Sequence, residues 1–168
     1  MAELDPDLAS MQEARDLASR AYEAWKVWAK ASQEQVDRVC AAMSAAAFNA
    51  AERLGQMAHD ETGYGVVAHK RLKNEFAAQN VWNSIKDIKT TGVIRHDPVK
   101  KIYEIAWPMG VIAALTPSTN PTSTVIYKIL IAVKARDAIV ISPHPSAARC
   151  SYEAAALMAK AAEENGAP

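Results

Sequence analysis

The segment Val111-Ile-Ala-Ala-Leu115 opens the part of the chain that decides its fold. This short, continuously apolar run is typical of a strand buried on both faces of a parallel sheet. A loop with two prolines follows at 116–121, then a predicted helix over 122–133, and then a second apolar run, Ala138-Ile-Val-Ile141. A further helix is predicted from about 146 to 164. This order predicts a βαβ unit, in which the helix returns the chain so that the two strands run parallel.

The residues before this unit have a helical pattern. Apolar side chains recur at helical spacing and predict three long helices, over about 10–30, 33–62 and 67–89. In the third, one side carries apolar residues that we expect to face the core, namely Leu72, Phe76, Val81 and Ile85. The other side is available to solvent and carries Lys73, Asn80 and Lys86.

A hairpin is predicted between the helices and the βαβ unit, because 93–97 and 101–106 alternate apolar and polar residues at period two. The chain is therefore α/β, with amino-terminal helices over 1–92, a hairpin arm over 93–108 and the start of a parallel α/β sheet over 109–168. Parallel sheets normally contain several more strands, so we expect this sheet to be incomplete and the chain to be the amino-terminal portion of a larger fold.

Composition excludes several classes of function. The 168 residues include 19 basic and 19 acidic side chains and are 50% hydrophobic, which excludes disorder and makes nucleic acid and membranes unexpected partners. Two cysteines, Cys40 and Cys150, are too few for a disulfide framework or a zinc site, and we predict no metal centre. The acidic start lacks the pattern of a secretion signal, so we expect a cytoplasmic protein.

The loops at 116–121 and 142–145 follow the two predicted parallel strands and should lie at the sheet edge where α/β proteins bind ligands. Asn120 and Pro121 suit the start of the helix that follows, since asparagine is a good cap and proline a good first residue. Asn120 is therefore either a helix cap only or part of a site for a polar or anionic ligand. The glycine-rich G-x-G-x-x-G fingerprint of dinucleotide-binding folds is absent.

Several motifs together resemble one enzyme family. They are Glu61-Thr-Gly63, Lys73-Asn-Glu-Phe-Ala77, Pro117-Ser-Thr-Asn-Pro-Thr-Ser-Thr124, Ile141-Ser-Pro-His-Pro145 and Gly166-Ala-Pro168. The chain resembles the amino-terminal portion of the CoA-acylating aldehyde dehydrogenases, which include the aldehyde half of bifunctional alcohol/aldehyde dehydrogenases. The resemblance implies a Rossmann-type sheet and an enzyme that converts an aldehyde, NAD and coenzyme A into an acyl-CoA and NADH.

The resemblance also implies roles for individual residues. Asn120 is the catalytic residue, whose amide holds the oxygen of the thiohemiacetal and thioester intermediates. The dinucleotide meets two sets of residues, with the nicotinamide half along Thr116, Pro117, Ser118 and Thr119 and the adenosine ribose at Ser142, Pro143 and His144. Non-acylating relatives usually have lysine at the position of Ser142, and we expect NAD rather than NADP. The arm at 93–108 resembles an oligomerisation element, so we expect a homo-oligomer.

The family's nucleophilic cysteine should lie beyond this chain, so we expect the 168-residue chain alone to be inactive. Cys150, near a predicted helix start, is a weak candidate for a substitute nucleophile, and packing explains it equally well. Glu61 has no evident proton to transfer and is interpreted as structural. The alternative function is a non-catalytic module that binds a nucleotide or a partner through its helices.

Overall fold

The computed structural model describes residues 5–168. Its helices are α1 (Pro6–Trp28), α2 (Gln33–Asn49), α3 (Ala51–Thr62), α4 (Val67–Glu75), α5 (Val81–Ile85), α6 (Pro121–Lys134) and α7 (Ala148–Glu163). A π-helical turn, η1 (Phe76–Asn80), joins α4 to α5, and a 3-10 turn, η2 (Pro145–Ala147), precedes α7. The strands are β1 (Gly92–Asp97), β2 (Ile102–Ala106), β3 (Val111–Thr116) and β4 (Ala138–Pro143).

The predicted βαβ unit is confirmed. β3 pairs in parallel with β4, from Val111 opposite Ala138 to Thr116 opposite Pro143, and α6 connects the two strands. At the carboxyl end of the pair, the backbone N–H of His144 donates to the carbonyl oxygen of Thr116 at 3.1 Å. The two loops that the sequence singled out therefore begin side by side.

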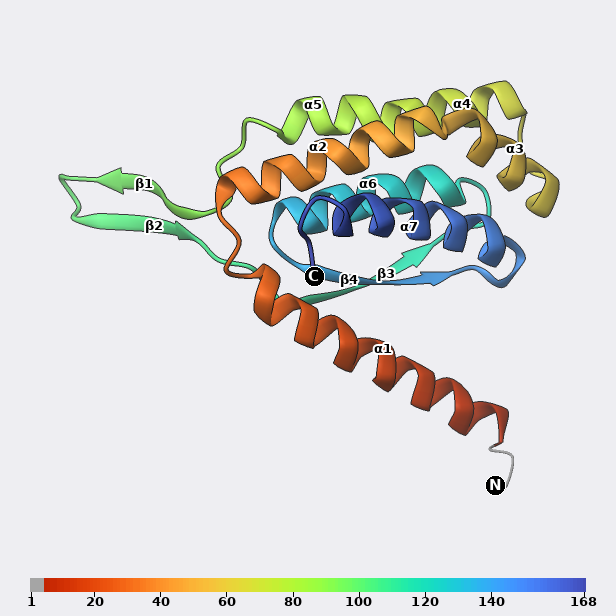
Figure 1. The fold of residues 1–168 in the computed structure, drawn as a ribbon, viewed down its shortest axis with the longest axis horizontal. Helices are drawn as coiled ribbons and strands as arrows, with labels where there is room; N and C mark the ends of the chain where they lie inside the picture. Colours follow the sequence, from red (N-terminus) through yellow and green to blue (C-terminus); the bar gives the residue numbers. More distant parts are fainter. Residues whose placement is uncertain (1–4) are drawn as a thin grey trace.

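Helices α2 to α7 form two layers over one face of this sheet (Figure 1). α6 and α7 lie on the sheet, and α2 to α5 lie over them. The core occupies the space between the layers, where Met43, Leu54, Ile126, Leu130 and Met158 are fully buried. α1 lies on the other side of the sheet, and the indole N–H of Trp28 at its end donates to the carbonyl oxygen of Val133 at 3.1 Å.

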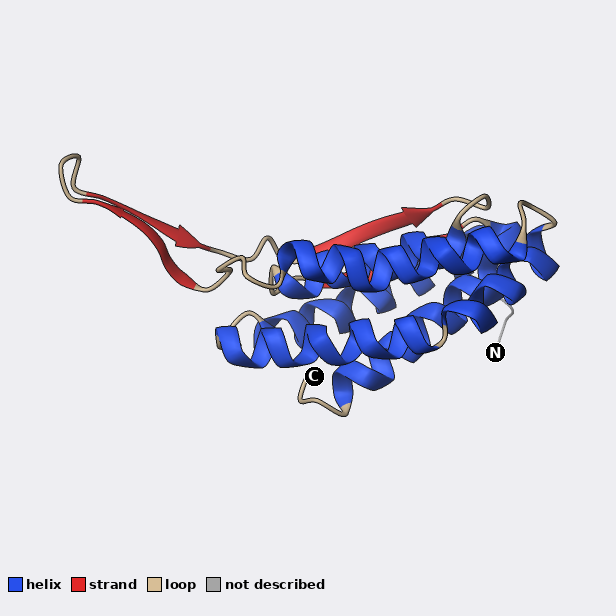
Figure 2. Cartoon of the chain, turned by 90° about the horizontal axis from the view of Figure 1, so that it is seen from above, coloured by secondary structure: helices blue, strands red, loops and turns tan. Residues whose placement is uncertain are grey.

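β1 and β2 form an antiparallel hairpin that extends away from the helices as an arm (Figure 2). The predicted hairpin is therefore confirmed. Its side chains are largely exposed although many are apolar, including Val99 at 90% and Ile105 at 60% exposure. His96 stacks on Tyr103 across the two strands, with ring centres 4.1 Å apart.

The helix predicted over 33–62 is two helices, because the backbone bends at Ala50 between α2 and α3. The continuous burial expected of the first parallel strand is also wrong for this chain. Along β3 only Ala114 and Thr116 are buried, whereas Leu115 is 73% exposed, because within residues 5–168 the helices that contact the sheet cover only part of it.

The expectation that Leu72 and Phe76 face the core is wrong, whereas Lys73, Asn80 and Lys86 are exposed as predicted. Leu72 and Phe76 are 60% and 62% exposed, and the buried side of α4 contains Lys70 and Asn74 instead. The apolar pattern mispredicts the buried face because two polar side chains occupy it. They are buried there because they form hydrogen bonds with polar groups of other segments.

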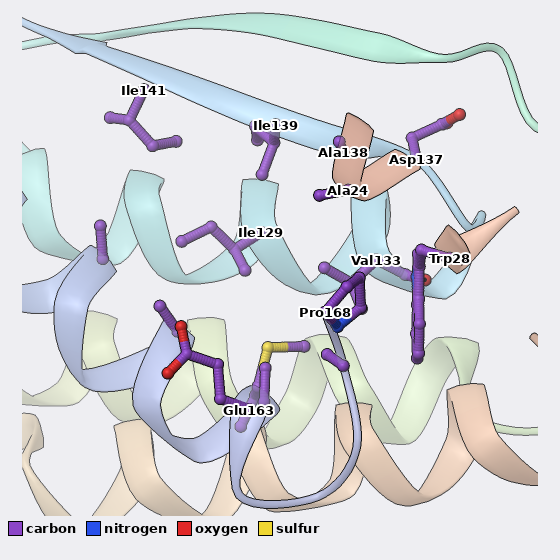
Figure 3. A pocket seen from close by; sticks show the side chains of 15 residues that line it. Ala24, Trp28, Ile129, Val133, Asp137, Ala138, Ile139, Ile141, Glu163 and Pro168 are labelled. Carbon is purple, nitrogen blue, oxygen red and sulfur yellow. The ribbon is translucent and has the colours of Figure 1, made fainter. Parts of the chain in front are cut away.

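An apolar pocket of about 220 Å³ lies between the end of α1, the strand β4 and helices α6 and α7 (Figure 3). Trp28, Val133, Ile139 and Pro168 contribute to its wall. Asp137 also lines the pocket, and its carboxylate accepts the backbone N–H of Gly110 at 2.8 Å. The pocket thus offers apolar packing surface and few free polar groups.

No helix in the described part of the chain has the length and apolarity needed to cross a membrane.

Candidate active site

Helix α4 holds the loop between β3 and α6 through buried polar side chains. Lys70 is only 5% exposed, and its ammonium donates to the carbonyl oxygen of Thr119 at 3.1 Å. Asn74 is 1% exposed, accepts the hydroxyl of Thr122 at 2.8 Å and donates to the carbonyl oxygen of Ala51 at 3.0 Å. Burial, and then the charge of neighbouring Lys73, lower the pKa of Lys70. These contacts fix the residues on both sides of Asn120.

Asn120 lies at the start of α6, but its side chain does not cap the helix. Its Oδ1 atom accepts the ammonium of Lys73 at 2.7 Å, and its Nδ2 atom has a long contact of 3.4 Å with the hydroxyl of Thr119. Pro121 needs no N–H partner, which lowers the demand for a cap at this position. The geometry therefore gives no support to a role as helix cap only.

The loop residues after β3 differ in burial. Thr116 is 5% exposed, and its hydroxyl has no hydrogen-bond partner among the described residues. Pro117 and Thr119 are exposed, and Ser118 is half-buried. A buried hydroxyl without a partner is unfavourable, and no contact among the described residues compensates this one.

The residues after β4 lie beside this loop. Ser142 and His144 are exposed, and Pro143 is half-buried. The Nδ1 atom of His144 accepts the backbone N–H of Ser146 at 3.2 Å and lies 2.8 Å from its hydroxyl oxygen. The structure thus brings the two predicted sets of dinucleotide-binding residues to one edge of the sheet.

Glu61, at the end of α3, caps the start of α7. Its carboxylate accepts the backbone N–H groups of Cys150 at 2.7 Å and Arg149 at 2.9 Å. Burial alone would raise the pKa of Glu61, but the hydrogen bonds from Cys150 and Arg149, together with the charge of Arg149, outweigh it and hold the pKa below its ordinary value. This geometry agrees with the structural interpretation of Glu61.

Neither cysteine is suited to act as a nucleophile. Both are fully buried, and burial raises the pKa of Cys40 and of Cys150 to about 12. Both thiols are therefore protonated at neutral pH, and the thiolate is the reactive form. Within residues 5–168, no group of three or more His, Cys, Asp or Glu side chains could hold a metal ion.

A cavity of about 470 Å³ adjoins Asn120, and sequence reasoning missed it. Leu72, Phe76 and Tyr127 contribute apolar wall, and Lys73 lies at its edge with Asn120. Leu72 and Phe76 were predicted to face the core, but they line this cavity. Their apolar character was visible in the sequence, but it does not distinguish a core residue from the wall of a cavity.

The model of the aldehyde dehydrogenase family matches residues 5–168. The chain is 41% identical over 161 residues to the bifunctional aldehyde-alcohol dehydrogenase AdhE of Escherichia coli K12, covering 96% of this chain and 18% of that protein. It is 54% identical to an acetylating aldehyde dehydrogenase from Geobacillus thermoglucosidasius, whose crystal structure superposes with a TM-score of 0.96 over 99% of this chain and 37% of that one.

A more distant solved structure is the propionaldehyde dehydrogenase of Rhodopseudomonas palustris, crystallised with bound CoA and an acylated cysteine. It is 26% identical, with a TM-score of 0.76 over 92% of this chain and 35% of that chain. The chain thus spans well under half the length of these proteins. The match along the whole described sequence, and the fold it shares with the acetylating enzymes, show that this chain belongs to the aldehyde dehydrogenase family.

Proposed function

We propose that this chain provides the oxyanion-binding and dinucleotide-binding part of a CoA-acylating, NAD-dependent aldehyde dehydrogenase. The observation that carries the proposal is the position of Asn120, which follows the carboxyl end of β3, lines a cavity between α4 and α6 and makes no helix-cap bond. An amide donor aimed at the oxygen of a reacting carbonyl stabilises the charge that develops there. The cysteine that forms the thioester is proposed to come from residues outside these 168.

The residues at the sheet edge fit a bound dinucleotide. Ser118 is half-buried and Thr119 is exposed, so both offer accessible polar atoms along the loop that follows β3. We propose that the nicotinamide half lies along this loop and that the adenosine ribose lies at Ser142, Pro143 and His144. Bound there, NAD would supply the hydride acceptor of the reaction.

We propose NAD rather than NADP as the preferred dinucleotide. A 2′-phosphate is usually bound by an arginine or another cation near the ribose. None of the three residues at the end of β4 is a lysine or an arginine. A dissociation constant for NADP lower than that for NAD would contradict this preference.

We propose a small aldehyde and coenzyme A as substrates. The apolar wall of Leu72, Phe76 and Tyr127 suits the hydrocarbon part of an aldehyde whose oxygen meets Asn120. Coenzyme A as acyl acceptor is supported by the likeness to a solved enzyme that contains CoA and an acylated cysteine. Both NAD and CoA are intracellular metabolites, which supports a cytoplasmic location.

The function is tested with the complete protein that the natural gene encodes. We expect CoA-dependent formation of NADH from a small aldehyde, and we expect Asn120→Ala to lower kcat about a hundredfold or more. A variant that retains its kcat would contradict the role of Asn120. The purified 168-residue chain is expected to form no NADH, and CoA-dependent activity of that chain would overturn the assignment of the nucleophile.

The second candidate function is a non-catalytic nucleotide-binding module. The observation that favours it is the state of the two thiols, which are buried and protonated. The intact mass of the protein from its native source separates the two functions. A mass far above 18.2 kDa supports the enzyme, and a mass equal to this chain supports the module.

We propose that the protein is a homo-oligomer that pairs through the arm formed by β1 and β2. The exposed apolar side chains of the arm, including Val99, Tyr103 and Ile105, support this proposal. Apolar surface of this kind is normally covered by a partner. Sedimentation of the complete protein as a monomer alone would contradict it.

A further inference from the structure

We propose that Lys73 is a positioning residue that sets the orientation of the Asn120 amide. This inference rests on the proposed role of Asn120 and deepens it. Lys73 lies on α4, 47 residues before Asn120 in the chain, and its ammonium contacts the Oδ1 atom of Asn120 at 2.7 Å. The contact joins two separate elements at the edge of the cavity next to α6.

The chemistry of the two groups decides which way the amide faces. An ammonium group has only donors, and only the oxygen of a side-chain amide can accept from it. With Oδ1 directed at Lys73, the Nδ2 atom must face the other way. There it has one long contact, 3.4 Å from the hydroxyl of Thr119. At least one of its hydrogens is therefore available to a substrate oxygen.

Without Lys73, the amide would lose this preference. Rotation about the terminal bond of asparagine has two broad and roughly equivalent wells, so an unrestrained amide presents its oxygen as often as its nitrogen. An oxygen facing the substrate oxygen would repel the developing negative charge. The positive charge of Lys73 also strengthens the hydrogen bond to Oδ1, and a polarised amide is a better donor at its nitrogen.

The neighbouring contacts keep the two side chains within reach of each other. Lys70 lies one helical turn before Lys73 and holds the carbonyl of Thr119, and Asn74 holds the hydroxyl of Thr122. Both of these α4 side chains are buried, whereas Lys73 is exposed. We therefore assign the anchoring of the loop to Lys70 and Asn74, and the orientation of the amide to Lys73.

The test is a double-mutant cycle in the complete protein. Lys73→Met keeps the aliphatic length and removes the donors, and we expect kcat to fall about tenfold with KM changed less than about twofold. In the Asn120→Ala background, the same substitution should change kcat by less than about twofold, because the group that Lys73 orients is gone. Lys160→Met on α7 is the matched control, since that side chain is 75% exposed and lies in the last turn of α7.

Each outcome separates the two proposals. If Asn120→Ala lowers kcat but Lys73→Met does not, the positioning role is wrong and the role of Asn120 stands. If Lys73→Met lowers kcat equally in both backgrounds, Lys73 acts independently of Asn120, and the positioning role is again wrong. If Asn120→Ala leaves kcat unchanged, the proposed function of Asn120 fails, and the positioning proposal fails with it. Unchanged melting temperatures of the variants confirm that the changes in kcat are not losses of folded protein.

Discussion

The helices α6 and α7 both begin at the carboxyl ends of the parallel strands, but their first turns are arranged differently. At α7, the carboxylate of Glu61 accepts two backbone N–H groups and occupies the helix start from within the protein. At α6, the side chain of Asn120 makes no cap bond and is held instead by Lys73 beside a cavity.

We interpret this difference as a division of roles at one sheet edge, with stability at the start of α7 and the proposed binding at the start of α6. A helix start whose N–H groups are bound by an internal carboxylate gains stability and has fewer free donors for a ligand. At the start of α6, Lys73 holds the oxygen of the Asn120 side chain, and the proposed role of Asn120 uses the N–H groups of that side chain. The three following predictions test whether the two helix starts differ in this way.

The largest effect is expected from a negative charge at the start of α6. Asn120→Asp in the complete protein should lower kcat about a thousandfold, because it removes the donor and places a carboxylate beside the developing oxyanion. The melting temperature should not fall, since aspartate is a good helix cap and pairs with Lys73. A kcat within tenfold of the original protein would show that the two helix starts do not differ in function.

A smaller effect is expected at the cavity wall. Phe76→Ala should lower kcat/KM for an apolar aldehyde about tenfold. The substrate loses its apolar contact with the phenyl ring, and the loss of such a contact lowers kcat/KM by about this factor. Tyr152→Ala on α7 is the matched control, because Tyr152 is also an exposed aromatic residue, at 73% compared with 62% for Phe76. Equal losses in the two variants would argue against a substrate role for the cavity beside α6.

The smallest effect is expected at the closed start of α7. The pKa of Glu61 is lower in the folded chain than its ordinary value. The ionised carboxylate therefore stabilises the fold fully at a pH above the ordinary pKa. This stabilisation is lost as the pH falls through the lowered pKa of the folded chain. Glu61→Gln should therefore lower the free energy of unfolding by about 1 kcal/mol at pH 7. The difference should shrink below about pH 4.

Urea unfolding of the original chain and the variant at pH 7 and pH 3 measures this effect. Glu13→Gln, at an exposed position of α1, is the control and should have no effect at either pH. A difference for Glu61→Gln that stays the same at both pH values would mean that the charge of Glu61 contributes nothing to the cap.

The sequence predicted the architecture better than the orientation of its helices. Two apolar runs identified both parallel strands, Val111 to Leu115 and Ala138 to Ile141. Short apolar runs bounded by loop residues are typical of strands in a parallel sheet. The hairpin followed from its alternating pattern. The inward side of α4 did not follow, because Lys70 and Asn74 are buried against carbonyl and hydroxyl groups of distant segments. No periodicity rule anticipates a polar residue whose partners lie far along the chain.

By itself, the sequence determined the order of elements, the parallel pairing and the sheet edge where Asn120 and His144 lie, since these depend on local patterns and on general rules of chain connection. The tertiary structure alone decided which groups meet at that edge. The pairing of Lys73 with Asn120 and of Glu61 with α7 joins residues 47 and 89 positions apart. Hydrogen bonds between such distant residues form only once packing has fixed the two backbones relative to each other. The positions of the side chains in the site therefore depend on the tertiary structure and not on the local sequence.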